Sequence, residues 1–173
     1  YGGVSPSRSH RDLVLRDHNP LSGVSSPTGR SDAPWRALVS LKRGYGHGNG
    51  ETMNKWEAWF DGATKATNPG ERGIGGVLKG PAGERIEISE SIGHGTNNEA
   101  EYAALMAVLD AAVEAKVEHL DVYGDSQLVV RQVNGEWLIK AKELVPMCQT
   151  VLRLKAQIPK CTLRWIPREE NAE

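Results

Sequence analysis

The chain has 173 residues, of which 39% are hydrophobic and 25% are charged, and its formal net charge is −1. This length and composition fit an ordinary soluble protein with one domain and an extra segment. The sequence excludes a membrane-spanning helix, since it has no run of about eighteen apolar residues, and a disulfide framework, since it has only two cysteines. No export signal opens the chain, so we expect a cytoplasmic protein, with a monomer as the default state.

Residues 1–52 differ in composition from the rest of the chain. They are rich in Gly, Ser, Pro, Arg and His, and their net charge is +3 (seven Arg and Lys against four Asp and Glu). Residues 53–173 carry −4 (fourteen against eighteen). We expect the first segment to be mostly disordered and outside the domain, because it can bury too little apolar surface to offset its ordering entropy. Met53 is a plausible native start, which would make the earlier residues upstream sequence.

From residue 53 onward the pattern is dense, and its first part predicts three strands. Lys55–Phe60 is a short apolar-rich strand and Gly73–Leu78 is a second one, with the turn sequence Asn68-Pro69-Gly70 between them. Pro81-Ala82-Gly83 predicts a hairpin turn into Arg85–Ile92, where isoleucines alternate with polar residues. We therefore expect an antiparallel meander of three strands.

The second part of the chain alternates helices with strands. Apolar residues recur at helical spacing from about residue 98 to 115, which predicts a long helix. Four further elements are expected in chain order: a strand over 119–123, helices over 126–132 and 143–156, and a strand over 161–166. A meander followed by strands that alternate with helices indicates an α/β fold, with a mixed sheet whose second half is parallel. Residues 53–173 are therefore expected to form one domain.

Three carboxylates occupy unusual places in this pattern. Asp61 ends the first predicted strand directly before Gly62, and Asp125 follows a later strand behind Gly124. Glu101 lies in the first turn of the long helix. Ligands of open α/β sheets gather outside the strand ends, so we expect these side chains to cluster there. Oxygen ligands without Cys or His suit Mg²⁺ or Mn²⁺.

Each carboxylate also has a structural interpretation. An Asp after a strand is usually a turn or cap residue. Glu101 has the spacing from Asn98 that would complete a capping box, Asn-x-x-Glu. The structural interpretation is the commoner one for any single residue, but all three together, at equivalent strand and helix ends, favour a metal site.

Four motifs in register carry a resemblance to a known family. They are Phe60-Asp61-Gly62-Ala63, Asn68-Pro69-Gly70, Thr96-Asn97-Asn98-Glu99-Ala100-Glu101-Tyr102 and Tyr123-Gly124-Asp125-Ser126-Gln127-Leu128-Val129. In order and spacing they resemble the successive signatures of type 1 ribonuclease H, and the resemblance covers residues 54–173. The stretch Gln132–Trp137 follows without the extra basic protrusion of some relatives, which is similar to the compact bacterial and archaeal members.

The resemblance implies a ribonuclease H-like fold, a five-stranded mixed sheet flanked by helices. It also implies an endonuclease that hydrolyses the RNA strand of RNA/DNA hybrids by a two-metal-ion mechanism. Asp61 would bridge two Mg²⁺ ions (Mn²⁺ is possible), and Glu101 and Asp125 would each complete one site. Two such ions can activate the attacking water and stabilise the departing oxygen.

The family also implies substrate contacts at named positions. Amide side chains can identify the RNA strand because only RNA carries 2′-hydroxyls, while hydroxyl, aromatic and basic side chains can hold the DNA strand. The amides are Asn97, Asn98 and Gln127, the hydroxyl is Thr96, the residues for the DNA strand are Trp137, Lys140 and Lys142, and Gly62 allows close approach. Helix capping by the asparagines and a core position for Trp137 are the alternatives.

The sequence departs from the family pattern in its last residues. A fourth catalytic carboxylate, an Asp that opens the final helix, is expected four residues after Asn171, which lies beyond Glu173. Arg168 lies in the loop where some relatives carry a proton-shuttling His. We therefore expect a ribonuclease H domain that lacks its C-terminal helix, and the activity of this chain itself stays open.

Other interpretations also stay open. A module of the same fold could bind RNA/DNA hybrids without cutting them, or a fragment without the fourth carboxylate could be inactive. An actin-like nucleotide-binding fold also begins with a strand and an Asp-Gly turn, but it needs far more residues and a second phosphate loop. The nuclease domain of a reverse transcriptase would follow a polymerase, and residues 1–52 show no polymerase-like strand pattern.

Overall fold

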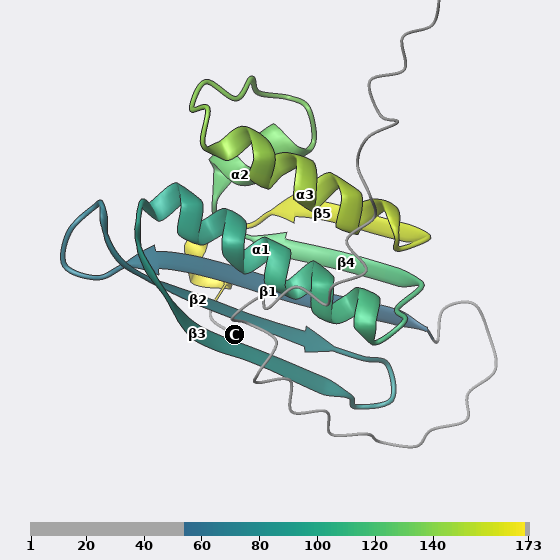
Figure 1. Ribbon diagram of the computed structural model, residues 1–173. Helices are drawn as coiled ribbons and strands as arrows, with labels where there is room; N and C mark the ends of the chain where they lie inside the picture. Colours follow the sequence, from purple (N-terminus) through teal and green to yellow (C-terminus); the bar gives the residue numbers. More distant parts are fainter. Residues whose placement is uncertain (1–53, 172–173) are drawn as a thin grey trace, which may run out of the picture. The chain divides into compact units, whose positions relative to one another are not determined.

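The computed structural model describes residues 54–171. Within them, five strands and three α-helices follow one another in the predicted order, and a short 3₁₀ turn comes last (Figure 1). In chain order they are β1 (Lys55–Thr64), β2 (Gly70–Lys79), β3 (Arg85–Gly95), α1 (Asn97–Glu114), β4 (His119–Gly124), α2 (Gln127–Val133), α3 (Leu144–Ala156), β5 (Lys160–Trp165) and the 3₁₀ turn Arg168–Glu170. The expected disorder of residues 1–52 and the expected boundary at Met53 lie outside the described residues.

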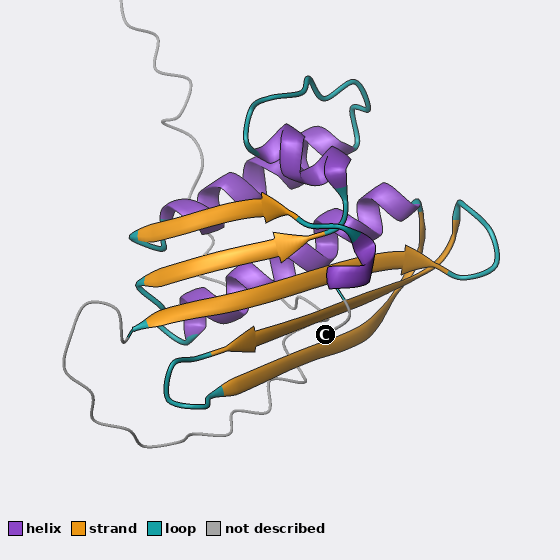
Figure 2. Ribbon diagram, turned by 180° about the vertical axis from the view of Figure 1, so that it is seen from behind, coloured by secondary structure: helices purple, strands orange, loops and turns teal. Residues whose placement is uncertain are grey.

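The strands form one five-stranded sheet in the order β3-β2-β1-β4-β5. The pairs β1–β2 and β2–β3 are antiparallel, whereas β1–β4 and β4–β5 are parallel. The expected α/β fold with a mixed sheet is therefore confirmed, with the meander on one side of β1 and the parallel strands on the other. Figure 2 shows the three helices together on one face of this sheet, and the 3₁₀ turn near the opposite face.

β1 is longer than predicted, and its length changes the setting of Asp61. The strand was expected to end at Phe60, but antiparallel pairing with β2 carries it on to Thr64, which lies opposite Arg72. Parallel pairing with β4 stops earlier, between Phe60 and Gly124. Asp61 therefore lies inside a strand, just past the point where β1 and β4 separate.

α1 is buried on almost every side, not only along the predicted apolar stripe. It packs against the sheet and also against α3, so that small and apolar residues are needed all around it (Figure 1). Gly76 of β2 makes part of this approach possible, because a Cβ there would lie 2.5 Å from Cγ2 of Val108. Although α1 is long and mostly buried, no helix within residues 54–171 is long and apolar enough to cross a membrane.

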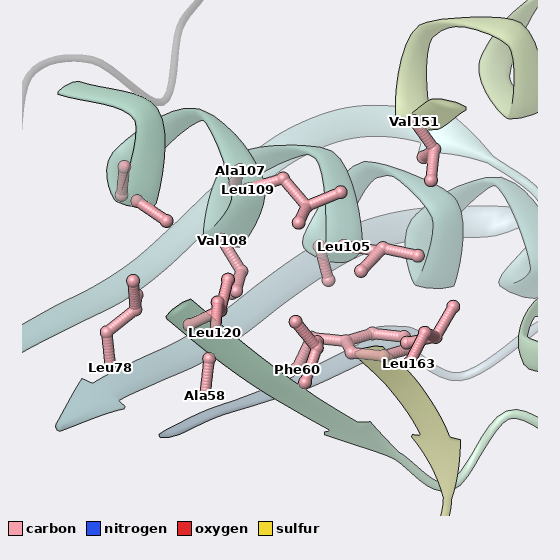
Figure 3. Packing of buried hydrophobic residues seen from close by; sticks show 14 of the residues in the cluster. Ala58, Phe60, Leu78, Leu105, Ala107, Val108, Leu109, Leu120, Val151 and Leu163 are labelled. Atoms are coloured by element: carbon pink, nitrogen blue, oxygen red, sulfur yellow. The ribbon is translucent and has the colours of Figure 1, made fainter. Parts of the chain in front are cut away.

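The hydrophobic core lies between the sheet and the helices (Figure 3). Phe60 of β1, Leu105 of α1 and Leu163 of β5 meet there, and Val151 reaches the cluster from α3. Burying a side chain of this size contributes about 1.5–3 kcal/mol relative to leaving it exposed. This packing fixes β1, α1 and β4 relative to one another, and these elements position the three carboxylates.

Candidate functional site

The three carboxylates singled out in the sequence lie together. Asp61 comes from β1, Glu101 from α1 and Asp125 from the residue after β4. One ligand oxygen of each lies within 4.8 Å of those of the other two. Their residues are separated along the chain, so the cluster exists only because the sheet and α1 bring three elements to one place.

The N-terminus of α1 explains why Glu101 is available for this cluster. The capping box is formed by Thr96 and Glu99: the Glu99 N–H donates to Thr96 Oγ1 at 3.3 Å, and the Thr96 N–H donates to Glu99 Oε2 at 2.6 Å. The alternative box between Asn98 and Glu101 is therefore wrong. Because the helix is capped two residues earlier than in the Asn98 alternative, Glu101 is not a capping residue and its side chain turns to β1.

Gly62 is required where α1 crosses β1. Its backbone N–H donates to Glu101 Oε2 at 3.2 Å. A Cβ at this position would lie 2.2 Å from the carbonyl carbon and oxygen of Ala100, a distance that no side chain tolerates. The close approach predicted for this glycine is thus an approach of the helix backbone, and it delivers a hydrogen bond to one carboxylate of the cluster.

The electrostatics of the cluster oppose its own ionisation. Burial, followed by the charges of Asp61 and Asp125, raises the pKa of Glu101 from 4.5 to about 8. Burial, followed by the charge of Asp125, also raises the pKa of Asp61. The Gly62 N–H and the Arg168 guanidinium oppose both shifts, but they do not cancel them. Carboxylates that repel one another in this way are stabilised by a cation placed between them.

Asp125 provides a separate sign that the site fits a metal ion. Its Oδ1 atom is buried and has no hydrogen-bond partner among the described residues. Its Oδ2 atom lies 3.9 Å from Nε of Arg168, a side chain that is 82% exposed. A buried carboxylate oxygen without a partner is costly in a folded protein unless an ion or water satisfies it. The set of three carboxylates around this atom matches the hard oxygen ligands that Mg²⁺ and Mn²⁺ prefer.

Residues after β4 and β5 hold the rim of the cluster. The indole N–H of Trp165 donates to the Asp125 backbone oxygen at 3.1 Å, and the Asn171 amide donates to the Phe60 backbone oxygen at 3.0 Å. Sequence reasoning did not identify Trp165, because this contact joins residues 40 positions apart. The sequence indicated only that Trp165 lies near the end of the last predicted strand. In the structure it lies opposite Gly124 in the parallel register of β4 and β5.

The asparagines at the start of α1 differ in what they can offer a ligand. Asn97 Oδ1 accepts the Thr64 N–H at 3.2 Å, and the Asn97 N–H donates to Asn68 Oδ1 at 3.0 Å. Asn97 therefore joins the helix to the end of β1 through its side-chain oxygen and to the β1–β2 turn through its backbone N–H. Asn98 is exposed, as is Gln127 at the start of α2.

The loop between α2 and α3, residues 134–143, carries the other predicted contacts. Trp137 is 46% exposed, so its alternative position in the core is wrong. Arg131 lies over its ring, 5.7 Å from the centroid, and pairs with Glu136. Lys140 and Lys142 are both exposed in the second half of this loop.

A groove connects this loop with the N-terminus of α1. It has a volume of about 520 Å³, and its walls include Asn98, Trp137 and Lys140, with Gln132 and Leu144 among the other lining residues. The structure therefore brings one predicted contact for RNA and two for DNA to a single groove.

Comparison with known proteins gives consistent results. The family model described as reverse transcriptase-like matches residues 59–173. Ribonuclease HI of Halobacterium salinarum is 46% identical over 81 residues, which is 46% of this chain and 40% of that protein. The chain thus spans less than half of the length of this curated relative.

Solved structures align over more of their length. RNase H1 from the halophilic archaeon Halobacterium salinarum superposes with a TM-score of 0.64 at 35% identity, covering 68% of this chain and 89% of that one. LC11-RNase H1, isolated from compost and solved in complex with an RNA/DNA hybrid, superposes with a TM-score of 0.62 at 32% identity, with 68% and 89% covered. The five-stranded sheet with its helices on one face is therefore an arrangement that the chain shares with these structures.

Proposed function

The chain belongs to the type 1 ribonuclease H family, and on this basis we propose that it hydrolyses the RNA strand of RNA/DNA hybrids with divalent metal ions. The observation that carries the proposal is the convergence of Asp61, Glu101 and Asp125 within 4.8 Å. The buried, unpartnered Oδ1 atom of Asp125 supports a cation in this position.

In this proposal the three carboxylates hold two Mg²⁺ ions, with Mn²⁺ as a possible replacement. Asp61 would serve both ions, and Glu101 and Asp125 would each hold one of them. When bound, the ions supply an activated water and stabilise the departing oxygen of the phosphodiester. The protein itself orients the ligands: the Gly62 N–H fixes Glu101 Oε2, and Trp165 fixes the backbone of Asp125. Arg168 places an exposed positive charge where the phosphate would arrive.

The RNA strand is identified through its 2′-hydroxyls, which donate and accept hydrogen bonds. We assign this contact to the exposed amides of Asn98 and Gln127 and to the side-chain N–H groups of Asn97, whose oxygen is already engaged. Thr96 was assigned to a DNA phosphate, but its hydroxyl donates to Glu99 at 2.9 Å. The Thr96 hydroxyl can therefore donate to a phosphate only if it turns away from Glu99.

The DNA strand is assigned to the loop of residues 134–143. An exposed indole can stack on a sugar or base, and lysines can neutralise phosphates. Trp137 and Lys140 line the same groove as Asn98, and Lys142 lies nearby in the loop. This arrangement supports a hybrid that lies with its RNA strand over α1 and its DNA strand over the loop.

Cleavage of a hybrid labelled on both strands tests the proposed function. With Mg²⁺ or Mn²⁺ we expect cuts in the RNA strand alone, with 5′-phosphate and 3′-hydroxyl products, and none in chelator. Asp61→Asn should abolish cutting, because it removes the shared ligand. Glu118→Gln, which changes an exposed carboxylate outside the cluster, is the matched control and should cut normally.

The same assay separates the alternatives. Hybrid binding without products, unchanged by metal, would contradict the nuclease and favour a non-catalytic binding module. Metal-dependent binding without products would contradict hydrolysis by this chain and would show that the three carboxylates alone do not support cutting. We further propose a cytoplasmic protein that acts as a monomer without an obligate partner. Light scattering of the full chain would test the monomeric state.

A further inference from the structure

Gln132 is a buried amide that connects three parts of the site region. Its side chain is one of three buried polar or charged side chains among the described residues, together with Glu101 and Asp121. The Tyr102 hydroxyl donates to Gln132 Oε1 at 2.9 Å. The Gln132 Nε2 group donates in turn to the backbone oxygen of Leu138 at 3.4 Å. Both the oxygen and the nitrogen of the amide therefore have a partner. One of these partners, Leu138, belongs to the loop that carries Trp137.

The other end of this connection is Tyr102 of α1, the helix that carries Glu101. Tyr102 follows Glu101 directly in α1, and Cys148 of α3 is a neighbour of its hydroxyl that raises the pKa of Tyr102. A side chain shared among α1, α2 and α3 in the core moves little, since all three helices are packed against it. Gln132 therefore reaches from a rigid point beside the carboxylate cluster to a loop without regular structure.

The loop is held at its two ends by contacts of its own, since Asn134 Nδ2 donates to the Leu163 backbone oxygen at 3.1 Å and Ile139 and Ala141 pack partly buried against the core. Leu138 is 87% exposed and Trp137 is 46% exposed, so neither side chain anchors the loop by burial. The backbone N–H groups of Glu136 and Trp137 donate to the Arg131 oxygen at 2.8 and 3.2 Å, which fixes the loop on one side of Trp137. Gln132 fixes it on the other side, at Leu138. Trp137 is thus held between two neighbouring residues of α2.

We propose that Gln132 is a positioning residue that sets the loop of residues 134–143 against α1, so that Trp137 and Asn98 contact the two strands of one hybrid. Gln132 also lines the groove between them. The inference rests on the proposed function, because it assumes that the loop holds the DNA strand. In this proposal Gln132 acts through the loop and is not a ligand of the metal ions.

The test measures binding of a fluorescent RNA/DNA hybrid by the full chain, with Ca²⁺ in place of Mg²⁺ to prevent cutting. Gln132→Met nearly keeps the volume of the side chain and removes its hydrogen bonds to the Tyr102 hydroxyl and the Leu138 backbone oxygen. Trp137→Ala should weaken binding about ten-fold, as the loss of a stacked aromatic does. Gln132→Met should weaken it several-fold, and the double variant should be no weaker than Trp137→Ala alone, because both changes remove one contact.

Two further measurements separate positioning from a general loss of structure. The affinity for Mn²⁺ without nucleic acid should stay within about two-fold of the unaltered chain in Gln132→Met, since the carboxylates are untouched and distant sites act independently. Tyr102→Phe leaves the Gln132–Leu138 bond in place, and it should weaken hybrid binding less than Gln132→Met does.

Each contrary outcome has one meaning. If Trp137→Ala binds the hybrid normally, the proposed role of the loop is wrong, and the inference falls with it. If Trp137→Ala weakens binding but Gln132→Met does not, or if the two effects add in the double variant, the inference alone is wrong. A parallel loss of Mn²⁺ affinity in Gln132→Met would also overturn it, because Gln132 would then support the fold of the site as a whole.

Discussion

Burial and neighbouring negative charges together raise the pKa of Glu101 strongly. This residue is 7% exposed and has two acidic neighbours, and only the Gly62 N–H donates a hydrogen bond to it among the described residues. In the absence of a cation the folded protein therefore favours its protonated form. This gives the metal-free protein a dependence on pH that exposed carboxylates do not produce.

We expect the metal-free protein to lose stability as the pH rises from about 4.5 to about 8. The pKa of Glu101 is about 8 in the folded state and near 4.5 in the unfolded chain, so the folded state binds this proton more tightly. The resulting stabilisation is complete below pH 4.5 and is lost as the pH approaches 8, by a few kcal/mol at about 1.4 kcal/mol per pKa unit.

Thermal unfolding in chelator at several pH values measures this effect. Glu101→Gln should flatten the dependence, with a residual slope from Asp61, whose pKa is also raised. Adding Mg²⁺ should restore stability at high pH to the unaltered chain more than to the variant. Equal slopes for the two proteins would show that Glu101 is ionised in the folded state without a metal.

At the level of elements, the crossing of α1 over β1 determines the geometry of the cluster. The helix backbone approaches the strand at Gly62, where no Cβ fits, and the strand in turn supplies a hydrogen bond to Glu101. The capping box of Thr96 and Glu99 fixes where the helix begins, and hence which residue of its first turns faces β1. The contact at Gly62 therefore both packs α1 against β1 and positions the Glu101 carboxylate.

Gly62→Ala should destabilise the protein by about 3 kcal/mol, because its Cβ meets backbone atoms of Ala100 that cannot move independently. Gly73→Ala is the matched control in β2: its Cβ would meet a single atom at 3.8 Å, so we expect a change of less than about 0.5 kcal/mol. Urea unfolding of both variants measures the difference. Similar midpoints would mean that α1 can shift away from β1, and that the crossing is not tight.

At the level of the whole molecule, net charge cannot explain binding to a polyanion. The chain has a net charge of −1, and residues 53–173 carry more acidic than basic groups. Attraction to a hybrid must therefore come from a local strip of positive charge, whereas the carboxylate cluster repels phosphates unless cations are bound. Lys140 and Lys142 of the loop are the lysines that the proposed function assigns to the DNA strand.

The salt dependence of hybrid binding tests this strip. In a plot of log affinity against log salt concentration, changing Lys140 and Lys142 to alanine should reduce the slope by about one for each phosphate that is no longer neutralised. Lys160→Ala is the control, because Lys160 is exposed at the opposite end of β5 from Trp165. A slope that changes equally in the control would indicate a diffuse effect of net charge.

The order of elements, the mixed sheet and the three carboxylates could all be derived from the sequence, because they depend on local pattern. Alternating strands and helical spacing are visible within a few residues, and Asp61, Glu101 and Asp125 stand out against such patterns. The motifs around them were specific enough to indicate the family. The roles proposed for the individual residues stay predictions, which the experiments above test.

Only the tertiary structure decided between alternatives that local pattern left equal. The spacing of Asn98 and Glu101 predicted a capping box, but in the structure Thr96 and Glu99 form the box and Glu101 accepts the Gly62 N–H. Trp137 could have been in the core, but the connection of its loop to Arg131 and Gln132 leaves it exposed. These outcomes depend on contacts between residues that are distant in the chain. No short segment of the sequence determines the free energy of such contacts.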